Sequence, residues 1–183
     1  MEDAQSRLQE WRTLYLEVFS IEIDTSELRI PKRVLGFNWL IVVTDGLTPN
    51  KVFEATKRLC GAGRYPRDLD SITSIRRTDK AYAIWVRDRV EADEELKRKS
   101  AQDLKRESVN CITLEERMLL EIWYYRKTGK HLDLKSWTLC AGSLDLNGDV
   151  LIVCWDGVGG RVYVSWEFPS ELAENLRARQ VVS

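Results

Sequence analysis

A segment rich in arginine, from Lys57 to Arg89, has the clearest capacity for chemistry in this chain. It holds nine basic and four acidic residues, a local charge of +5, whereas the remainder carries −6. Arginine binds phosphate through paired hydrogen bonds and stacks on bases, and aromatic rings offer further stacking platforms. The candidate binding residues are Arg64, Arg67, Arg76, Arg77, Trp85, Arg87 and Asp88. They predict a site for single-stranded nucleic acid or a nucleotide. The alternative is a solvated loop whose arginines pair with the acidic stretch that follows.

The same region raises the question of a metal-dependent nuclease of the D…E-x-K type. Asp88 follows a run of residues that predicts a strand, and Glu95 and Lys97 supply the E-x-K pattern. In such nucleases this pattern lies on a strand, so that the carboxylate and the amine point to one side. Here acidic residues precede basic ones by four positions, which is typical of a helix. The pattern therefore favours a solvated helix face.

Metal and cofactor sites have little support elsewhere. The cysteines, at positions 60, 111, 140 and 154, are too scattered for a zinc site, and we expect reduced thiols. His131 follows a predicted helix end, where we expect a surface or helix-terminus side chain. Asp145, Asn147 and Asp149 match the start of a calcium loop, but Val150 stands where that loop needs glycine, and Asn-Gly predicts a hairpin turn. Phosphate-binding glycine loops and nucleophile motifs are absent from the sequence. We predict no metal, no cofactor and no catalytic residue.

Periodicity predicts the elements that must position these residues. Apolar spacings of three and four predict helices over 4–19, 49–60 and 114–128, the last two capped by Thr48 and Thr113. β-rich runs predict strands over 39–44 and 82–86. The charged stretch 88–107 predicts a helix that Ser100 interrupts and recaps. After residue 137 the period becomes two, which predicts a three-stranded antiparallel meander. We expect one α+β domain over 1–183, with about five antiparallel or mixed strands and helices mainly on one face.

Composition narrows the class of protein. The chain is 44% hydrophobic and 31% charged, with a net charge of −1. These values exclude a disordered chain and a generally basic nucleic-acid protein. The chain is rich in tryptophan, with seven residues, most of which we expect in the core. No stretch approaches the roughly 20 apolar residues of a membrane span, and the acidic, polar start does not resemble a signal peptide. We expect a cytoplasmic protein with no membrane partner.

Four phrases, YAIWVRDRVEADEEL, ITLEERMLLEIWYYRKTGKHLD, WTLCAGS and LRARQVVS, resemble those of a family of small bacterial proteins with no assigned activity. The resemblance covers most of residues 35–183. It implies a bacterial, cytoplasmic, single-domain protein. It implies no activity, cofactor or catalytic residues, so no role is carried over to any position here.

The sequence therefore predicts a small cytoplasmic binding or interaction module without catalytic activity, whose partner is a protein or a small molecule. The alternative is a protein that binds single-stranded nucleic acid through residues 57–89, as a nuclease or as an accessory to one. An enzyme of another kind is the third hypothesis. The direction of the arginines separates the first two hypotheses. Convergent arginines beside an exposed Trp85 would favour nucleic acid, and arginines paired with Glu91–Glu95 would favour the first hypothesis.

Overall fold

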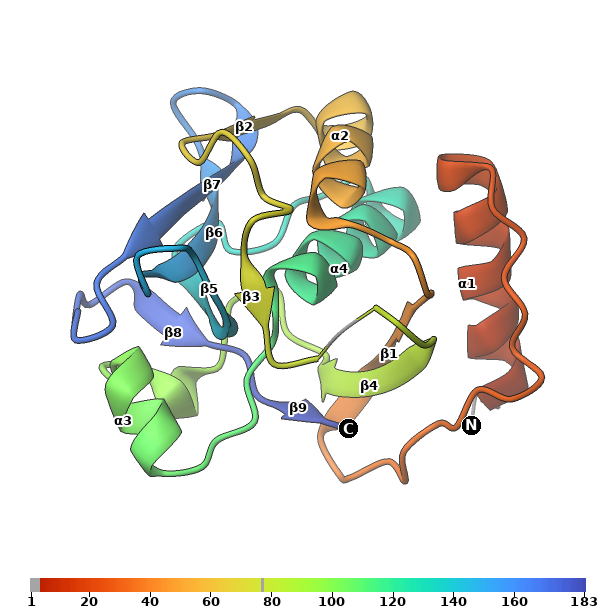
Figure 1. Ribbon diagram of the computed structural model, residues 1–183, viewed down its shortest axis with the longest axis horizontal. Coiled ribbons are helices and arrows are strands. Elements are labelled where there is room, and N and C mark those ends of the chain that lie inside the picture. Colours follow the sequence, from red (N-terminus) through yellow and green to blue (C-terminus); the bar gives the residue numbers. More distant parts are fainter. Residues whose placement is uncertain (1–3, 77) are drawn as a thin grey trace.

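The computed structural model describes residues 4–76 and 78–183, and Figure 1 shows the order of its elements. The helices are α1 (Ala4–Phe19), α2 (Pro49–Cys60), the 3-10 helix η1 (Glu94–Leu96), α3 (Ala101–Arg106) and α4 (Leu114–Thr128). The strands are β1 (Phe37–Val43), β2 (Ala62–Arg64), β3 (Thr73–Ser74), β4 (Tyr82–Arg87), β5 (Trp137–Leu144), β6 (Val150–Asp156), β7 (Arg161–Glu167), β8 (Leu176–Ala178) and β9 (Val181–Val182). The α+β class is confirmed, together with the three helices predicted from apolar spacing.

The strands form two sheets, which corrects the expectation of one sheet of about five strands. The smaller sheet has the order β1-β4-β9 and is antiparallel. The larger has the order β2-β7-β6-β5-β3, with β8 paired to β5. Within it β5, β6 and β7 form the predicted antiparallel meander, and β2 and β8 join it in parallel.

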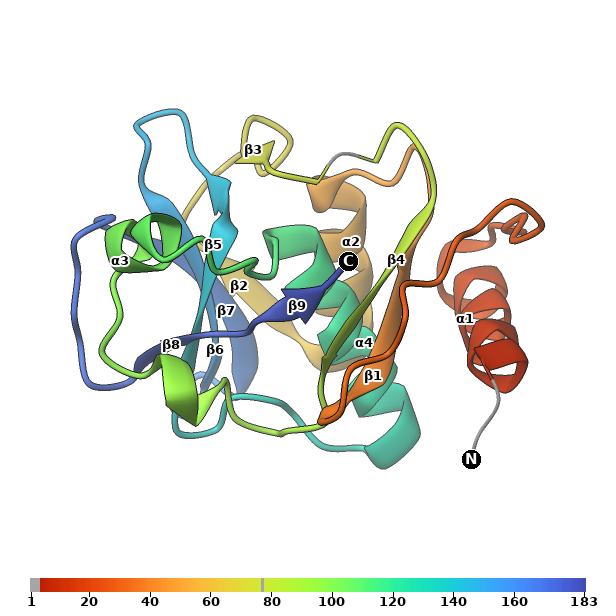
Figure 2. The same cartoon turned by 90° about the horizontal axis from the view of Figure 1, so that it is seen from below.

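The position of α4 explains this division. Every residue from Leu114 to Tyr124 is buried, and the helix contacts β1, β5, β6 and α2. Figure 2 shows α2 and α4 between the two sheets, with α1 beside β1 on the outside. A helix buried all round needs cover on more than one side, which a single sheet cannot give. The expectation of helices mainly on one face is corrected accordingly.

α1 closes the outer edge of β1 with side-chain donors. Trp11 Nε1 donates to the carbonyl oxygen of Leu40 at 2.9 Å. One helical turn later, the hydroxyl of Tyr15 donates to the carbonyl oxygen of Val42 at 2.8 Å. Four helical residues rise about 6 Å and two strand residues about 6.6 Å, so the side-chain donors of α1 match the spacing of the carbonyl groups of β1. The helix thereby occupies an edge that would otherwise be open to pairing with another chain.

The charged stretch 88–107 is only partly helical, which corrects the prediction made from its acid-before-base pairs. The 3-10 helix η1 is three residues long, and Ser100 then caps α3 as predicted, through a capping box with Asp103. The acid-before-base pairs four positions apart do not form among these described residues, and some acidic side chains pair with residues outside the stretch. Arg87 donates to Asp93 at 2.5 Å, and the Asp93 backbone N–H donates to the carbonyl of Ala178.

The turn between β5 and β6 is the predicted hairpin. Asp145 Oδ1 accepts from the backbone N–H groups of Asn147 and Asp149 at 2.8 and 2.9 Å, so this carboxylate organises the turn. Within residues 4–76 and 78–183, no three His, Cys, Asp or Glu side chains gather as metal ligands would. None of the helices in the described part of the chain has the length and apolar character needed to cross a bilayer.

Candidate functional site

Arg76, from the basic segment, is committed to the interior. Its Nε and Nη2 donate to the two oxygens of the buried Glu116 at 2.6 and 2.8 Å. Its remaining contacts are the side chain of Asn110 and the carbonyl of Cys111, each at 2.6 Å. The hydroxyl of Tyr82 also donates to Glu116, at 2.9 Å. This cluster fixes the loop before β4 onto the first turn of α4, so the Arg76 charge is already balanced by a carboxylate.

The residues predicted at the end of β4 are likewise engaged. Trp85 is 4% exposed, and its Nε1 donates to the carbonyl of Pro31 at 2.9 Å. Arg87 pairs with Asp93 and stacks over a phenylalanine ring at 4.3 Å. Asp88 is exposed and accepts from the Asn38 amide at 3.0 Å. Trp85 therefore offers no open ring for a base.

The other predicted site residues lie elsewhere. Arg64 donates to the Asn50 side chain and stacks over the ring of Phe53 at 4.6 Å. Arg67 is exposed, and Arg77 lies outside the described residues. The structure thus distributes the predicted residues over three places, near α2, at the start of α4 and at the end of β4. Arg89 pairs with Glu95 at 2.5 Å, so two arginines pair with the acidic stretch, as the alternative interpretation expected.

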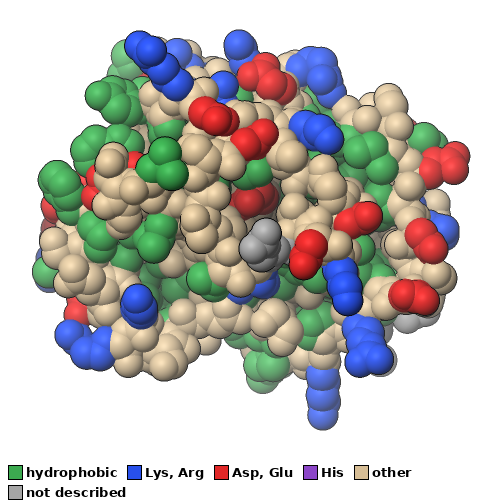
Figure 3. Space-filling model, in the orientation of Figure 1, with side chains coloured by type: hydrophobic (Ala, Val, Ile, Leu, Met, Phe, Trp, Pro, Cys, Tyr) green, Lys and Arg blue, Asp and Glu red, His purple; other side chains and the backbone are tan. Residues whose placement is uncertain are grey.

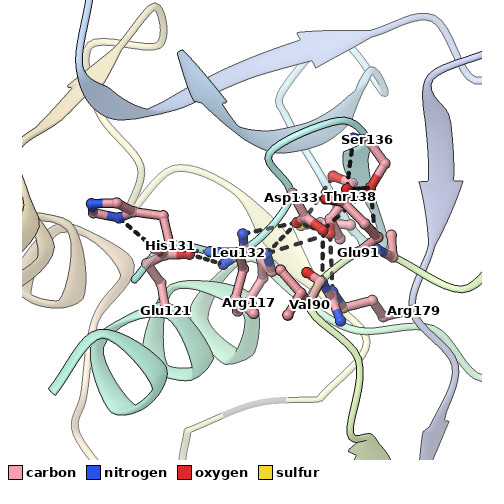
Figure 4. Close-up of polar contacts among 12 residues, drawn as sticks. Val90, Glu91, Arg117, Glu121, His131, Leu132, Asp133, Ser136, Thr138 and Arg179 are labelled. Carbon is pink, nitrogen blue, oxygen red and sulfur yellow. Dashed lines mark hydrogen bonds and ion pairs between the residues drawn. The ribbon is translucent and has the colours of Figure 1, made fainter. Parts of the chain in front are cut away.

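A buried ionic network is the largest polar feature of the interior, and sequence reasoning did not identify it. Arg117 of α4 is fully buried between Glu121 at 2.9 Å and Asp133 at 2.8 Å. Asp133 also accepts from Arg179, at 2.6 Å. Figure 4 shows Arg117, Asp133, Arg179 and Thr138 converging, with Glu121 and His131 to one side. The network joins α4, the loop after it, β5 and the segment before β9.

Electrostatics explains why Asp133 stays charged inside the protein. Burial alone would raise its pKa, but the guanidinium groups of Arg179 and Arg117 outweigh burial and hold the pKa below its usual range. The group is fully buried, so no substrate reaches it. Its role is to hold the two sheets and α4 together. Arg117 and Arg179 could have been noticed as charges in apolar surroundings, but their partners lie far away in sequence.

His131 ends this network at the surface. Its Nδ1 lies 3.0 Å from Glu121, and its ring stacks between Trp155 at 3.7 Å and Tyr125 at 4.9 Å. The side chain is 16% exposed, so the prediction of a surface position is only approximately right. Both ring faces are covered, which leaves neither for a ligand.

The cysteines are equally inaccessible. All four are unpaired and buried. Burial raises the pKa of the Cys60 thiol to about 12 and that of Cys154 to about 11. A thiol with so high a pKa is not a nucleophile at neutral pH.

A carboxyl group lies in a shallow cleft where β3 meets the start of α4. The cleft has a volume of about 390 Å³, and Glu115 and Ser74 are among its lining residues. The hydroxyl of Ser74 donates to Glu115 at 3.0 Å and lies 2.8 Å from that of Ser143. The Ser143 hydroxyl accepts from the Leu114 backbone N–H at 2.9 Å. Burial raises the pKa of Glu115. The cluster anchors the first turn of α4 to β3 and β5.

An exposed aromatic group lies at the far end of the larger sheet. We call Tyr65, Trp166 and Phe168 the aromatic triad. The ring of Trp166 meets Tyr65 at 6.2 Å and Phe168 at 5.6 Å, both edge to face. Tyr65 is 67% exposed and Phe168 is 58% exposed. Among the predicted site residues only Arg64 and Arg67 neighbour the triad in sequence, on either side of Tyr65.

Two more exposed apolar side chains lie at the β5–β6 hairpin. Leu144 and Leu146, in and beside the β5–β6 hairpin, are 39% and 81% exposed. Leu144 pairs with Val150, which pairs with Glu167. Paired residues share one face of a sheet and successive residues alternate, so this register places Leu144 on the face of Glu167 and not on that of Trp166. Figure 3 shows hydrophobic side chains gathered on the side of the molecule that carries β7 and this hairpin, at the left of the view.

Comparison of the chain with protein-family models, curated proteins and solved structures finds no match. The sequence signal for the triad was present but weak, because Trp166 and Phe168 lie in and beside a predicted strand.

Proposed function

We propose that this protein is a non-catalytic binding module that captures a protein partner through the aromatic triad. The observation that carries the proposal is the exposure of Tyr65 and Phe168 against the edge of Trp166. Burying an exposed aromatic ring is a strong source of binding energy, and aromatic residues are enriched at the centres of protein interfaces.

Charge supports a protein partner over nucleic acid at this surface. Asp68 and Asp70 follow Tyr65 closely and are exposed. Glu167 and Glu171 flank Phe168, and the pKa of Glu167 is raised by partial burial and then by the nearby charge of Glu171. These four carboxylates outnumber Arg64 and Arg67, the two arginines on either side of Tyr65, so the local charge disfavours a phosphate backbone. The alternative of single-stranded nucleic acid binding by residues 57–89 ranks second because Arg76 and Arg87 already have carboxylate partners.

A cytoplasmic setting belongs to the same proposal. Four buried, unpaired thiols suit a reducing compartment. The resemblance to small bacterial proteins points to a bacterial cytoplasm.

Affinity capture from the native host, followed by titration of the captured protein, tests the proposal. The test variant is the double substitution Tyr65→Ser and Phe168→Ser. The matched control is Leu35→Ser and Val158→Ser, which removes two apolar side chains that are 99% and 102% exposed and lie outside the triad. All four sites are exposed, so each double variant should retain stability to within about 1 kcal/mol.

We expect the triad variant to bind the captured protein at least roughly tenfold more weakly, the effect of losing a binding hot spot. The control should bind as the unaltered chain does. Equal binding by both variants would refute the proposal. Binding of a labelled 20-nucleotide strand at micromolar protein in about 50 mM salt, where electrostatic association is strong, would favour the second hypothesis instead.

A further inference from the structure

β4 has a free edge where it leaves its neighbour β9. Of its six residues, only Trp85 and Val86 pair with β9, whereas the strand pairs with β1 along its whole length. No other strand of the described chain lies beside Tyr82–Ile84 on that side. Figure 2 shows β4 continuing past the end of β9. Alternate residues of a strand direct their N–H and C=O groups to opposite sides, so this stretch presents unpaired backbone groups there.

The other edge of the same sheet is treated differently. β1 has its carbonyl groups occupied by Trp11 and Tyr15 of α1. Among the described residues, no helix lies along the free edge of β4. Proteins usually cover or charge an exposed strand edge, because such an edge pairs readily with other chains. An edge left open in a sheet whose opposite edge is capped is therefore suited to adding a strand from a partner.

A cleft runs along this free edge. It has a volume of about 620 Å³, and its lining includes Ala81, Tyr82 and Ala83 of the β4 side and the segment from Arg29 to Lys32. Ile30, Pro31 and the two alanines give the cleft an apolar lining. Ser183, just after β9, closes one end. The small side chains leave room for an extended backbone beside β4.

The rims of the cleft are basic. Arg29, Lys32 and Lys80 line it and are exposed, and none of them has a charged partner within the described residues. Arg76 also lines the cleft, but Glu116 balances its charge. Asp79 is the one acidic side chain among the described lining residues. Three unpaired cations against one carboxylate make the cleft complementary to acidic side chains.

We propose that the free edge of β4 binds an extended acidic peptide segment by strand addition. The backbone of the segment pairs with Tyr82–Ile84, and its carboxylates lie against Arg29, Lys32 and Lys80. Single-stranded nucleic acid fits less well, because the one aromatic ring lining the cleft, that of Tyr82, is half-buried and its hydroxyl is bonded to Glu116. This site is separate from the aromatic triad and does not depend on the function proposed for it.

Three labelled eight-residue peptides test the proposal by fluorescence anisotropy. The first alternates Glu and Val, the second alternates Lys and Val, and the third alternates Glu and Pro. The third keeps the acidic charge but removes half of the backbone donors that strand addition requires. We expect the Glu–Val peptide alone to bind, with affinity that falls as salt increases. Equal binding of the Glu–Pro peptide would overturn the proposal, because charge alone would then be sufficient.

Charge reversal locates the site. Lys32→Glu with Lys80→Glu should weaken the Glu–Val peptide by about tenfold, because two exposed attractions become repulsions. Lys130→Glu, at an exposed position after α4, is the matched control and should change little. Amide hydrogen exchange should slow at residues 81–84 when the peptide binds. Absence of that protection, equal effects of the two charge reversals, or no binding of the Glu–Val peptide would each refute the proposal. Substitutions in the aromatic triad should leave this binding unchanged.

Discussion

Asp133 supplies one carboxylate to two buried guanidinium groups, so replacing it tests how the two sheets are held together. Arg179 Nη2 lies 2.6 Å from one of its oxygens, and Arg117 Nη2 lies 2.8 Å from the other. In Asp133→Ala, Arg117 keeps only Glu121 as a charged partner. Arg179 keeps the carbonyl groups of Arg89 and Val90. Breaking one buried pair costs about 3–5 kcal/mol, because the remaining charge stays buried without its counter-charge.

The variant should therefore lose about 3–5 kcal/mol of the free energy of unfolding. For a chain of this length 1 kcal/mol shifts the melting temperature by about 2–4 °C, so the midpoint should fall by about 6–20 °C. Urea denaturation and calorimetry measure both quantities. Asp133→Asn, which keeps the shape and one acceptor, is the milder variant if the alanine protein does not fold. Glu174→Ala is the control, since its pair with Arg98 has side chains 76% and 66% exposed, and it should cost no more than about 1 kcal/mol.

The same residue contributes a pH dependence with a defined sign. The pKa of Asp133 is held below its ordinary value of 3.8 in the folded protein. The stabilisation is fully present above that value and is lost as the pH falls through the lowered pKa. Asp133→Ala should therefore flatten the acid limb of the stability profile. A loss below about 1 kcal/mol at pH 7, or an unchanged acid limb, would show that the network does not stabilise the fold as described.

The remaining predictions concern the core, the sheet edge, the start of α4 and the thiols. Ile122→Ala, at a side chain with no exposed surface, should cost about 2–5 kcal/mol in urea denaturation; a change near zero would contradict the central position of α4. Tyr15→Phe removes the hydroxyl that donates to Val42 and accepts from Thr44, and should cost about 1–3 kcal/mol by the same assay; an unchanged stability would mean that α1 does not cap β1. Because the pKa of Glu115 is raised in the folded protein, stability should fall as the pH rises through its ordinary value of 4.5, and Glu115→Gln should abolish that fall in melting curves from pH 4 to 8. Thiol titration of the denatured protein, purified without reductant, should find four free thiols, and two or fewer would contradict the buried, unpaired cysteines.

The sequence predicted helix ends and turns well where contacts between residues close in sequence determine them. The capping box of Thr113 and Glu116 starts α4 as expected, and Asn147 with Gly148 turns the hairpin. The stretch 88–107 was predicted less well, because Asp93 pairs with Arg87 of β4 and Glu95 pairs with Arg89, which lies before η1. Its acid–base spacing suits a helix, but tertiary pairing determines the structure.

The arrangement of the elements and the surface could not be predicted in the same way. That α4 separates two sheets depends on which strands pair, and β9 is only two residues long. The buried position of Trp85 depends on the carbonyl of Pro31, which is distant in sequence. The exposure of Tyr65 and Phe168 depends on where neighbouring elements end. Sequence identifies residues capable of binding, and packing then decides which of them remain available.

Amide hydrogen exchange of the chain, alone and with its captured partner, tests the central claim most directly. If the aromatic triad is the binding surface, exchange should slow at Tyr65 and at residues 166–168 on binding, while α1 and the end of β4 stay unchanged. Exchange reports local opening, so a surface covered by a partner is detected at the segment that it covers. Protection confined to segments away from the triad, or none anywhere, would contradict the assignment of this surface as the binding site.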